Sequence, residues 1–186
     1  MKNAIIIHGM PDKEEYLKED SFRENQHWLP WLQHRFCIKG ILAQVPAMPE
    51  PYAPDYEKWK EVFEYFPINE ETILVGHSCG GGFLVRWLSE NKVNVGQVVL
   101  VAPWLDPDKE FTKGFFDFVI DPDLVSRTKG VTVFYSLDDG KEILESVATI
   151  KATLPDAVFR EFTNAGHFCE EDGYKEFPEL LEAIHL

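Results

Sequence analysis

A serine flanked by glycines, in the pentapeptide Gly-His-Ser-Cys-Gly at residues 76–80, constrains the fold of this chain more than any other feature. An apolar run precedes it at residues 72–75, and residues 81–88 after it begin with glycines and continue with apolar residues at helical spacing. This order predicts a buried strand, a tight turn and a helix. Such a turn brings Gly76 and Gly80 close together, which gives both positions a steric reason to be small. The pattern is that of a nucleophile elbow, in which Ser78 stands at the tip of a strained turn.

The rest of the chain alternates short apolar runs with amphipathic stretches. Predicted strands cover residues 4–8, 40–45, 72–76, 97–102, 131–136 and 158–162, and predicted helices cover residues 22–36, 55–66, 80–90, 140–154 and 174–184. Strands with near-continuous apolar faces, alternating with helices, indicate a mostly parallel sheet that is covered on both faces. We therefore expect a compact three-layer α/β sandwich with a six-stranded sheet, in one domain spanning residues 1–186.

Charge and composition narrow the classes of partner and the setting. The formal net charge of −14 at pH 7 disfavours nucleic acids and anionic membranes, because like charges repel at long range. No apolar stretch approaches the roughly 20 residues that span a bilayer, and charged residues interrupt the N-terminus too early for a secretory signal. The three cysteines show neither a disulfide framework nor metal-ligand spacing. We expect a cytoplasmic protein that needs no metal or organic cofactor.

A serine nucleophile needs a base, and His167 is the strongest candidate. A serine hydroxyl is a weak nucleophile at neutral pH unless a neighbouring group takes its proton. His167 follows the last predicted strand, so its loop should lie at the same edge of the sheet as Ser78. His77 is expected to point elsewhere by strand alternation, whereas His27 and His34 fall on a predicted helix.

The base needs a carboxylate that orients it, and the chain offers two. Asp138 and Asp139 end the predicted strand at residues 131–136, between Ser78 and His167 in chain order. That order, nucleophile then acid then base, is typical of this kind of elbow. One of the two aspartates could instead cap the helix that starts near Gly140. Spacing alone leaves both assignments open.

Acyl transfer also needs hydrogen-bond donors for the developing oxyanion. The backbone N–H of Cys79, directly after the serine, supplies one. The loop after the first strand should supply the other, and we expect it to be the N–H of Met10, which follows Gly9. Cys79 itself is disfavoured as a nucleophile, because the bulky His77 would then occupy a position that the elbow requires to be small.

Two long connections stand out. The proline-rich residues 46–54 predict a stiff surface loop. Residues 103–127 carry five aromatic side chains, too many for a polar connector, so this segment should pack over something apolar. It could form the wall of a substrate pocket, with Trp104, Phe115 and Phe116 as candidates, or it could be ordinary core packing.

With these residues in place, the chain resembles the α/β-hydrolase superfamily over nearly its whole length. Within it, the chain is similar to the small single-domain serine hydrolases that include retinoblastoma-binding protein 9 and the YdeN-type proteins. The pieces that carry the resemblance are His8-Gly9, residues 27–32 (His-Trp-Leu-Pro-Trp-Leu), residues 46–49 (Pro-Ala-Met-Pro), Trp59, and residues 76–78, 138–139 and 166–168.

The resemblance implies a serine hydrolase with Ser78 as nucleophile, Asp139 as acid and His167 as base. It points to an enzyme that cleaves small to medium acyl esters, and its expected partner is a small acyl substrate. Relatives often carry an apolar-proline pair after the acid, where this chain has Gly140 to Ile143. That difference keeps two alternatives open: a binding or regulatory protein on a hydrolase scaffold, and a carboxylate role for Asp138. An acyltransferase would use the same residues.

Overall fold

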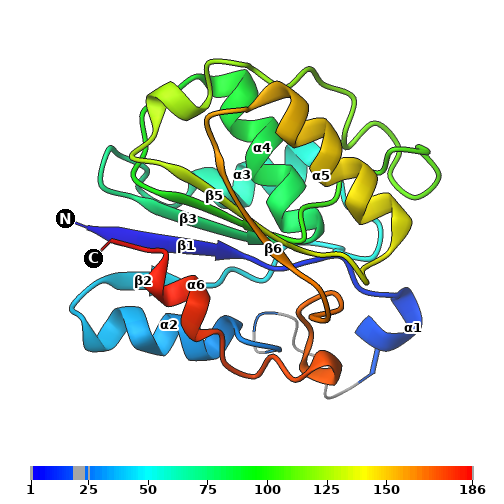
Figure 1. Ribbon diagram of the computed structural model, residues 1–186, viewed down its shortest axis with the longest axis horizontal. Helices are drawn as coiled ribbons and strands as arrows, with labels where there is room; N and C mark the ends of the chain where they lie inside the picture. The colour runs from blue at the N-terminus through cyan, green and yellow to red at the C-terminus, as the bar shows by residue number, and fades with distance from the viewer. Residues whose placement is uncertain (1, 19–23, 25, 186) are drawn as a thin grey trace.

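The computed structural model of the protein describes residues 2–18, 24 and 26–185. Its centre is a six-stranded sheet in the order β2-β1-β3-β4-β5-β6, in which every neighbouring pair runs parallel (Figure 1). The strands are β1 (Asn3–Ile7), β2 (Leu42–Gln44), β3 (Ile73–His77), β4 (Val98–Val101), β5 (Val131–Ser136) and β6 (Val158–Phe162). The predicted sheet is confirmed, and each strand lies within its predicted range or extends one residue beyond it.

The burial of the central strands explains why their apolar residues predict them. Every residue of β1, β3 and β4 is buried, in keeping with their runs of isoleucine, valine and leucine. The edge strand β6 differs, because its residues are exposed or half-buried. A parallel sheet needs apolar residues on both faces only where helices cover both faces.

Helices form one layer on each face of the sheet. Helices α2 and α6 cover one face, and α3, α4 and α5 cover the other (Figure 1). The helices are α1 (Lys13–Tyr16), α2 (Leu29–Ile38), α3 (Tyr56–Glu64), α4 (Cys79–Asn91), α5 (Lys141–Thr153) and α6 (Pro178–Glu182), with short 3₁₀ turns η2 (Val125–Arg127) and η3 (Glu170–Asp172). The three-layer α/β sandwich is therefore confirmed. No helix in the described part of the chain is long and apolar enough to cross a lipid bilayer.

Two helices begin later than their predicted ranges, and proline accounts for both. The helix expected over residues 22–36 begins at Leu29, with Pro30 in its first turn; residues 22, 23 and 25 of that range lie outside the described residues. The helix expected over residues 174–184 begins at Pro178. Proline suits the first turn of a helix, where its missing N–H would have no partner. The first correction matters for function, because it removes His27 from the helix.

The strand order creates a crevice at one edge of the sheet. The chain passes from β1 to the edge strand β2 and then returns to β3 on the other side of β1. After β1 it leads to α2 on one face, and after β3 it leads to α4 on the opposite face (Figure 1). The loops at the carboxyl ends of β1 and β3 therefore diverge, which is where open α/β sheets bind their ligands. Gly9 and Ser78 lie in these loops.

Both long connections are anchored to the rest of the molecule by specific contacts. In the proline-rich segment, Met48 is 1% exposed and the carbonyl of Pro49 accepts a hydrogen bond from the Trp59 indole at 2.9 Å. Ala47, Glu50 and Ala53 are exposed, so the segment is a surface loop, as expected, that Met48 and Pro49 anchor to the core.

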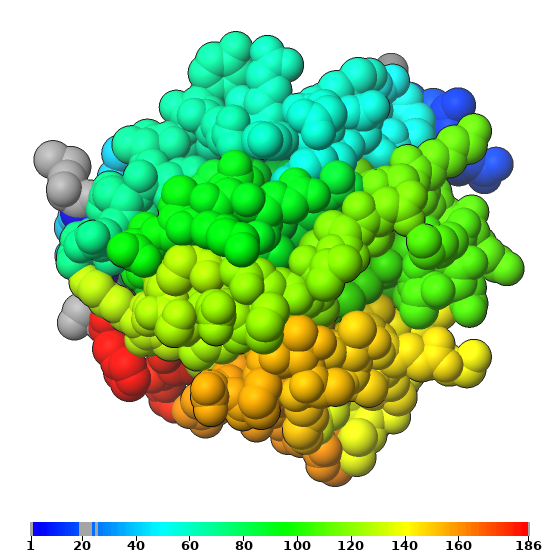
Figure 2. Space-filling view, turned by 90° about the horizontal axis from the view of Figure 1, so that it is seen from above, coloured from blue at the N-terminus to red at the C-terminus, as the bar shows by residue number. Residues whose placement is uncertain are grey.

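The segment between β4 and β5 runs across the layer of α3, α4 and α5, between α4 and α5 (Figure 2). The Arg86 guanidinium of α4 donates to the carbonyls of Gly114 and Phe115, at 2.8 and 2.7 Å. On the other side, the N–H of Leu105 donates to the Ser146 hydroxyl of α5 at 3.0 Å. The segment is fixed to both helices.

Candidate active site

Ser78 occupies a strained position between β3 and α4. Its φ of 52° and ψ of −121° lie in a region that residues with a side chain rarely adopt. Several backbone hydrogen bonds hold this conformation: Ser78 N–H donates to the Val101 carbonyl at 2.9 Å, and the Ser78 carbonyl accepts from the N–H groups of Gly82 and Trp104, both at 3.1 Å. The predicted strand, tight turn and helix are confirmed, and the serine lies at the tip of the turn.

The two flanking glycines are each required by a close approach to a different part of the backbone. A Cβ atom on Gly76 would lie 2.6 Å from the Gly80 carbonyl oxygen, as the predicted closeness of the two glycines implies. A Cβ atom on Gly80 would instead lie 2.4 Å from the Ile7 carbonyl oxygen and 2.5 Å from that of His8. Gly80 therefore lets α4 pack directly against the end of β1.

Cys79 faces the interior, as expected. Its side chain is 0% exposed, and burial, followed by the nearby Asp106 carboxylate, raises the pKa of its thiol. A thiol that stays protonated is a poor nucleophile. The environment of Cys79 therefore excludes it as a competitor of Ser78.

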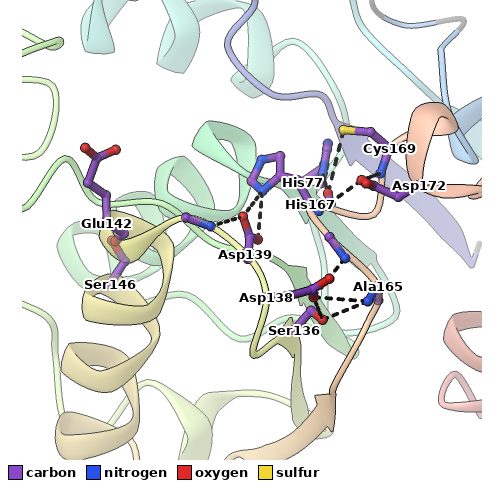
Figure 3. A network of polar contacts seen from close by, with 12 residues as sticks. His77, Ser136, Asp138, Asp139, Glu142, Ser146, Ala165, His167, Cys169 and Asp172 are labelled. Carbon is purple, nitrogen blue, oxygen red and sulfur yellow. Dashed lines mark hydrogen bonds and ion pairs between the residues drawn. The ribbon is translucent and has the colours of Figure 1, made fainter.

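His167 contacts Asp139 directly (Figure 3). The Nδ1 atom of His167 lies 2.9 and 3.1 Å from the two carboxylate oxygens of Asp139. The Asp139 side chain is only 5% exposed, and it also accepts a hydrogen bond from Gly140 N–H at 2.7 Å. An ionised carboxylate can only accept, so Nδ1 of His167 donates and the neutral ring keeps a lone pair on Nε2. That nitrogen can take up a proton.

Asp138 has a different role, which separates the two aspartates. Its carboxylate accepts hydrogen bonds from the Ser136 hydroxyl and from the N–H groups of Ala165 and Gly166, the latter two at 3.2 and 3.1 Å (Figure 3). The bond from Ser136, together with the two backbone N–H groups, lowers the pKa of the Asp138 carboxyl. Asp138 thus ties the loop after β6 to the end of β5, while Asp139 faces the histidine. The contact with Asp139 forms even though Gly140 follows it.

The loop that carries His167 is held at several points. Asp172 accepts hydrogen bonds from the N–H groups of His167 and Cys169, both at 3.0 Å. Gly166 has a φ of 52°, and a Cβ atom there would lie 2.2 Å from an Asp172 carboxylate oxygen. The close approach of Asp172 therefore requires glycine directly before His167.

Ser78 and His167 line one cavity of about 120 Å³. The other residues that line it are His8, Gly9, Met10, His27, Leu29, His77 and Cys169. Nucleophile and base candidates from distant parts of the chain therefore meet at one site.

Two histidines of this cavity were wrongly placed by sequence reasoning. His27 was expected on a helix but lies before α2, with a φ of 55°. His77 was expected to point elsewhere, yet its Nε2 atom lies 2.8 Å from the His167 carbonyl oxygen (Figure 3). The only available signal was chain position, because both residues adjoin elements that end at the cavity.

The two expected oxyanion donors are related to Ser78 in different ways: Met10 belongs to the lining of the cavity, and Cys79 directly follows the serine. Cys79 is the first residue of α4, where the N–H groups of a helix lack intrahelical acceptors. Among the described residues, neither the Met10 nor the Cys79 N–H group has a hydrogen-bond acceptor. Both groups are therefore available to a ligand oxygen.

The expected pocket residues do not line this cavity, and that prediction is corrected. Trp104 and Phe115 are buried, and Phe115 packs against Trp59 with ring centroids 5.2 Å apart. Phe116 lines a different cavity of about 470 Å³, between the segment after β4 and helix α5. Of the two alternatives for this segment, core packing accounts for Trp104 and Phe115. The cavity that Ser78 lines lies toward the end of β1, where Gly9 contacts the serine.

One cluster near the cavity has the chemistry of metal ligands. Donor atoms of His27, Cys169 and Glu171 lie within 4.8 Å of one another, although the sequence showed no such spacing. However, the N–H of Glu170 donates to Nδ1 of His27 at 3.0 Å, so the neutral ring carries its hydrogen on Nε2. A metal ion needs a ring lone pair, and the one His27 has is engaged by this bond.

Comparison with known proteins places the chain among relatives of similar size. A family model described as "Serine hydrolase" matches residues 19–185. YdeN of Bacillus subtilis is 30% identical over 193 residues, which cover 98% of this chain and 94% of that protein. The crystal structure of the ydeN gene product matches with a TM-score of 0.82 at 26% identity, covering 98% of this chain and 96% of the other.

More distant solved structures share the fold. Est1E of Butyrivibrio proteoclasticus, solved with ferulic acid bound, has a TM-score of 0.62 at 15% identity and covers 98% of this chain and 90% of its own. The esterase domain of a Rhodothermus marinus protein has a TM-score of 0.67 at 14% identity, covering 97% and 84%. At such identities the likeness concerns the fold alone.

Proposed function

The chain belongs to the serine hydrolase family and is a hydrolase with the α/β-hydrolase fold, and from this premise we propose that it cleaves small carboxylic esters with a Ser78–His167–Asp139 triad. The observation that carries the proposal is the contact of His167 Nδ1 with Asp139, combined with the cavity that His167 shares with Ser78. This arrangement gives the serine a base, and it gives the base an orienting carboxylate.

The reaction proceeds through an acyl-enzyme. Ser78 Oγ attacks the ester carbonyl carbon while its proton passes to Nε2 of His167. Asp139 holds the ring orientation and stabilises the imidazolium that forms. The tetrahedral intermediate collapses, the carbon–oxygen bond to the alcohol breaks, and His167 returns the proton to that alcohol.

Hydrolysis of the acyl-enzyme repeats these steps with water. His167 takes a proton from the water, whose oxygen attacks the acyl carbon, and then gives it to Ser78 Oγ as the carboxylic acid leaves. In both steps the N–H groups of Cys79 and Met10 stabilise the negative charge on the carbonyl oxygen. Such donors act most strongly where they are fixed in place before the reaction.

The size of the cavity favours a short acyl group. The cavity is small, with a volume of about 120 Å³. That space suits an acetyl or butyryl group better than a long chain. Two structures that share the fold support an ester as the bond that is cleaved: one is an esterase domain, and the other holds bound ferulic acid.

A series of p-nitrophenyl esters tests the proposal. We expect the purified protein to hydrolyse the acetate and butyrate faster than the octanoate, and Ser78→Ala to lose activity about 1,000-fold or more. A fluorophosphonate probe should label Ser78 in the wild-type protein and leave Ser78→Ala unlabelled. Turnover that is equal in the two proteins, together with an unlabelled Ser78, would mean that the scaffold serves binding instead.

A further inference from the structure

His8 is a buried histidine whose two ring nitrogens are both engaged. It follows β1 directly and is 1% exposed. Its Nδ1 atom lies 2.8 Å from the carbonyl oxygen of Gly9, and its Nε2 atom lies 3.0 Å from the backbone nitrogen of Met48. These two contacts come from the loop after β1 and from the proline-rich segment.

The chemistry of the two partners fixes the position of the ring hydrogen. A backbone N–H can only donate, so Nε2 of His8 accepts from Met48. A carbonyl oxygen can only accept, so Nδ1 carries the hydrogen and donates to Gly9. The neutral ring with its hydrogen on Nδ1 is the one form that satisfies both bonds.

The bond to Gly9 determines which way the next N–H points. The described part of the chain contains no cis peptide bond, and in a trans peptide the C=O and N–H groups point in opposite directions. The Gly9 carbonyl is held toward the His8 ring, so the Met10 N–H of the same peptide points away from that ring. This loop lies against the nucleophile, because a Cβ atom on Gly9 would be 3.1 Å from Cβ of Ser78.

We propose that His8 is a positioning residue, which fixes the Gly9–Met10 peptide so that the Met10 N–H serves as an oxyanion donor. The hydrogen bond from the Met48 N–H supports this role, because it holds the His8 ring in the tautomer that can donate to Gly9. Without the bond to Gly9 the peptide can rotate, and the Met10 N–H then no longer meets the carbonyl oxygen of the substrate. The proposal rests on the ester hydrolysis proposed above and adds a residue that acts through the Gly9–Met10 peptide.

Two substitutions of His8 each remove one of the two hydrogen bonds that its ring makes. In His8→Asn the amide nitrogen lies close to the place of Nδ1, so it can donate to the Gly9 carbonyl but cannot reach Met48. In His8→Gln the longer side chain brings an oxygen close to the place of Nε2, so it can accept from Met48 but leaves the Gly9 carbonyl without its donor. Each variant removes one buried hydrogen bond, and their melting temperatures should fall by similar amounts.

Steady-state kinetics with p-nitrophenyl acetate provide the test. We expect His8→Gln to lower kcat by about 10- to 100-fold with KM changed less than about threefold, because an oxyanion donor acts mainly in the transition state. His8→Asn should retain at least about ten times the kcat of His8→Gln. A trifluoromethyl ketone, whose adduct with the serine places an oxyanion at the same donors, should bind His8→Gln more weakly by a factor close to the loss of kcat/KM.

Two results would overturn the proposal. One is an equal loss of kcat in both variants that follows the loss of melting temperature, since this would make His8 a purely structural residue. The other is unchanged affinity for the ketone in His8→Gln. The failure of the proposed function itself is distinguishable, because a wild-type protein no more active than Ser78→Ala would reject ester hydrolysis before any His8 variant is compared.

Discussion

His77 donates a hydrogen bond from its ring Nε2 atom to the backbone carbonyl oxygen of His167, at a distance of 2.8 Å (Figure 3). This bond links the residue directly before the proposed nucleophile to the proposed base itself. It joins the end of β3 to the loop after β6, and these two strands are separated in the sheet by β4 and β5. The position of His167 relative to Ser78 therefore depends on a hydrogen bond that involves neither the Ser78 nor the His167 side chain.

A substitution of His77 should impair catalysis strongly if it removes the hydrogen-bond donor to His167, and less if the new side chain also offers a donor. His77→Leu removes the donor, and we expect kcat for p-nitrophenyl acetate to fall by about 10- to 100-fold, since displacing a catalytic group by ~1 Å can cost that much. His77→Gln, whose amide nitrogen has a similar reach, should retain more of the activity. Equal kcat values for the two variants at matched melting temperatures would contradict this role of the hydrogen bond.

Substitutions of the two neighbouring aspartates should affect different properties, activity for Asp139 and stability for Asp138. Asp139→Asn removes the carboxylate that contacts His167, and we expect kcat to fall by about 1,000-fold or more with little change in stability. Asp138→Asn should keep most of the activity at neutral pH but lower the free energy of unfolding, because its carboxylate binds Ser136, Ala165 and Gly166. Kinetics and urea unfolding of both variants check this assignment, and a reversed pattern would transfer the role to Asp138.

The stabilising effect of Asp138 should depend on pH in one direction. Its pKa in the folded protein lies below the ordinary value of 3.8, chiefly because of the hydrogen bond from Ser136. A lowered pKa means that the unfolded chain binds the proton first, so the stabilisation is complete above 3.8 and is lost as the pH falls below it. The difference in unfolding free energy between wild type and Asp138→Asn should thus become smaller as the pH falls from 5 to 3. Urea unfolding at a series of pH values would measure it. A difference independent of pH would show that the charge of Asp138 is not what stabilises the loop.

Gly76 should tolerate no side chain. A Cβ atom there would lie 2.6 Å from the Gly80 carbonyl oxygen, and backbone cannot move aside as a flexible side chain does. We expect Gly76→Ala to lose about 3 kcal/mol of unfolding free energy or to be insoluble. Gly140→Ala is the matched control: nothing lies within 4 Å of its Cβ position, and its cost should stay within about 1 kcal/mol. Chemical denaturation compares the two, and similar stabilities would contradict the steric account.

The cysteines should react in the order of their exposure. Cys37 is exposed, whereas Cys79 is fully buried with a raised thiol pKa. Iodoacetamide at neutral pH should therefore modify Cys37 in the folded protein and reach Cys79 only after denaturation, as peptide mass spectrometry would show. Cys79→Ala should retain an active Ser78, since Cys79 contributes to the proposed mechanism only its backbone N–H. Loss of ester hydrolysis in a stable Cys79→Ala protein would contradict that assignment.

The errors of sequence reasoning share a physical cause. Strand alternation predicted that His77 points elsewhere, but alternation holds only while the backbone stays extended, and Ser78 leaves that geometry with a φ of 52°. Amphipathic spacing placed His27 on a helix, whereas the helix starts at Leu29 with Pro30 in its first turn. Both residues adjoin the irregular backbone of the site, where periodic patterns no longer report side-chain direction.

The role of the aromatic segment was left open between two alternatives for a related reason. An excess of aromatic residues correctly indicated burial, and Trp104 and Phe115 are buried. Hydrophobicity, however, has no direction, so it could not say whether these rings face the core or a substrate. The answer depends on partners such as Trp59 and Tyr56, which contact Phe115 from α3, a distant part of the chain.

The sequence by itself determined the order of strands and helices, the register of the turn on Ser78, and the placement of Asp139 and His167 at strand ends. Such features follow from interactions between residues near one another in the chain: periodic burial and the sterics of a tight turn. Only the tertiary structure decided which aspartate faces His167 and which backbone carbonyls the His8 and His77 rings bind. Those contacts join distant segments whose side-chain directions are set by backbone angles and packing, which local pattern does not encode.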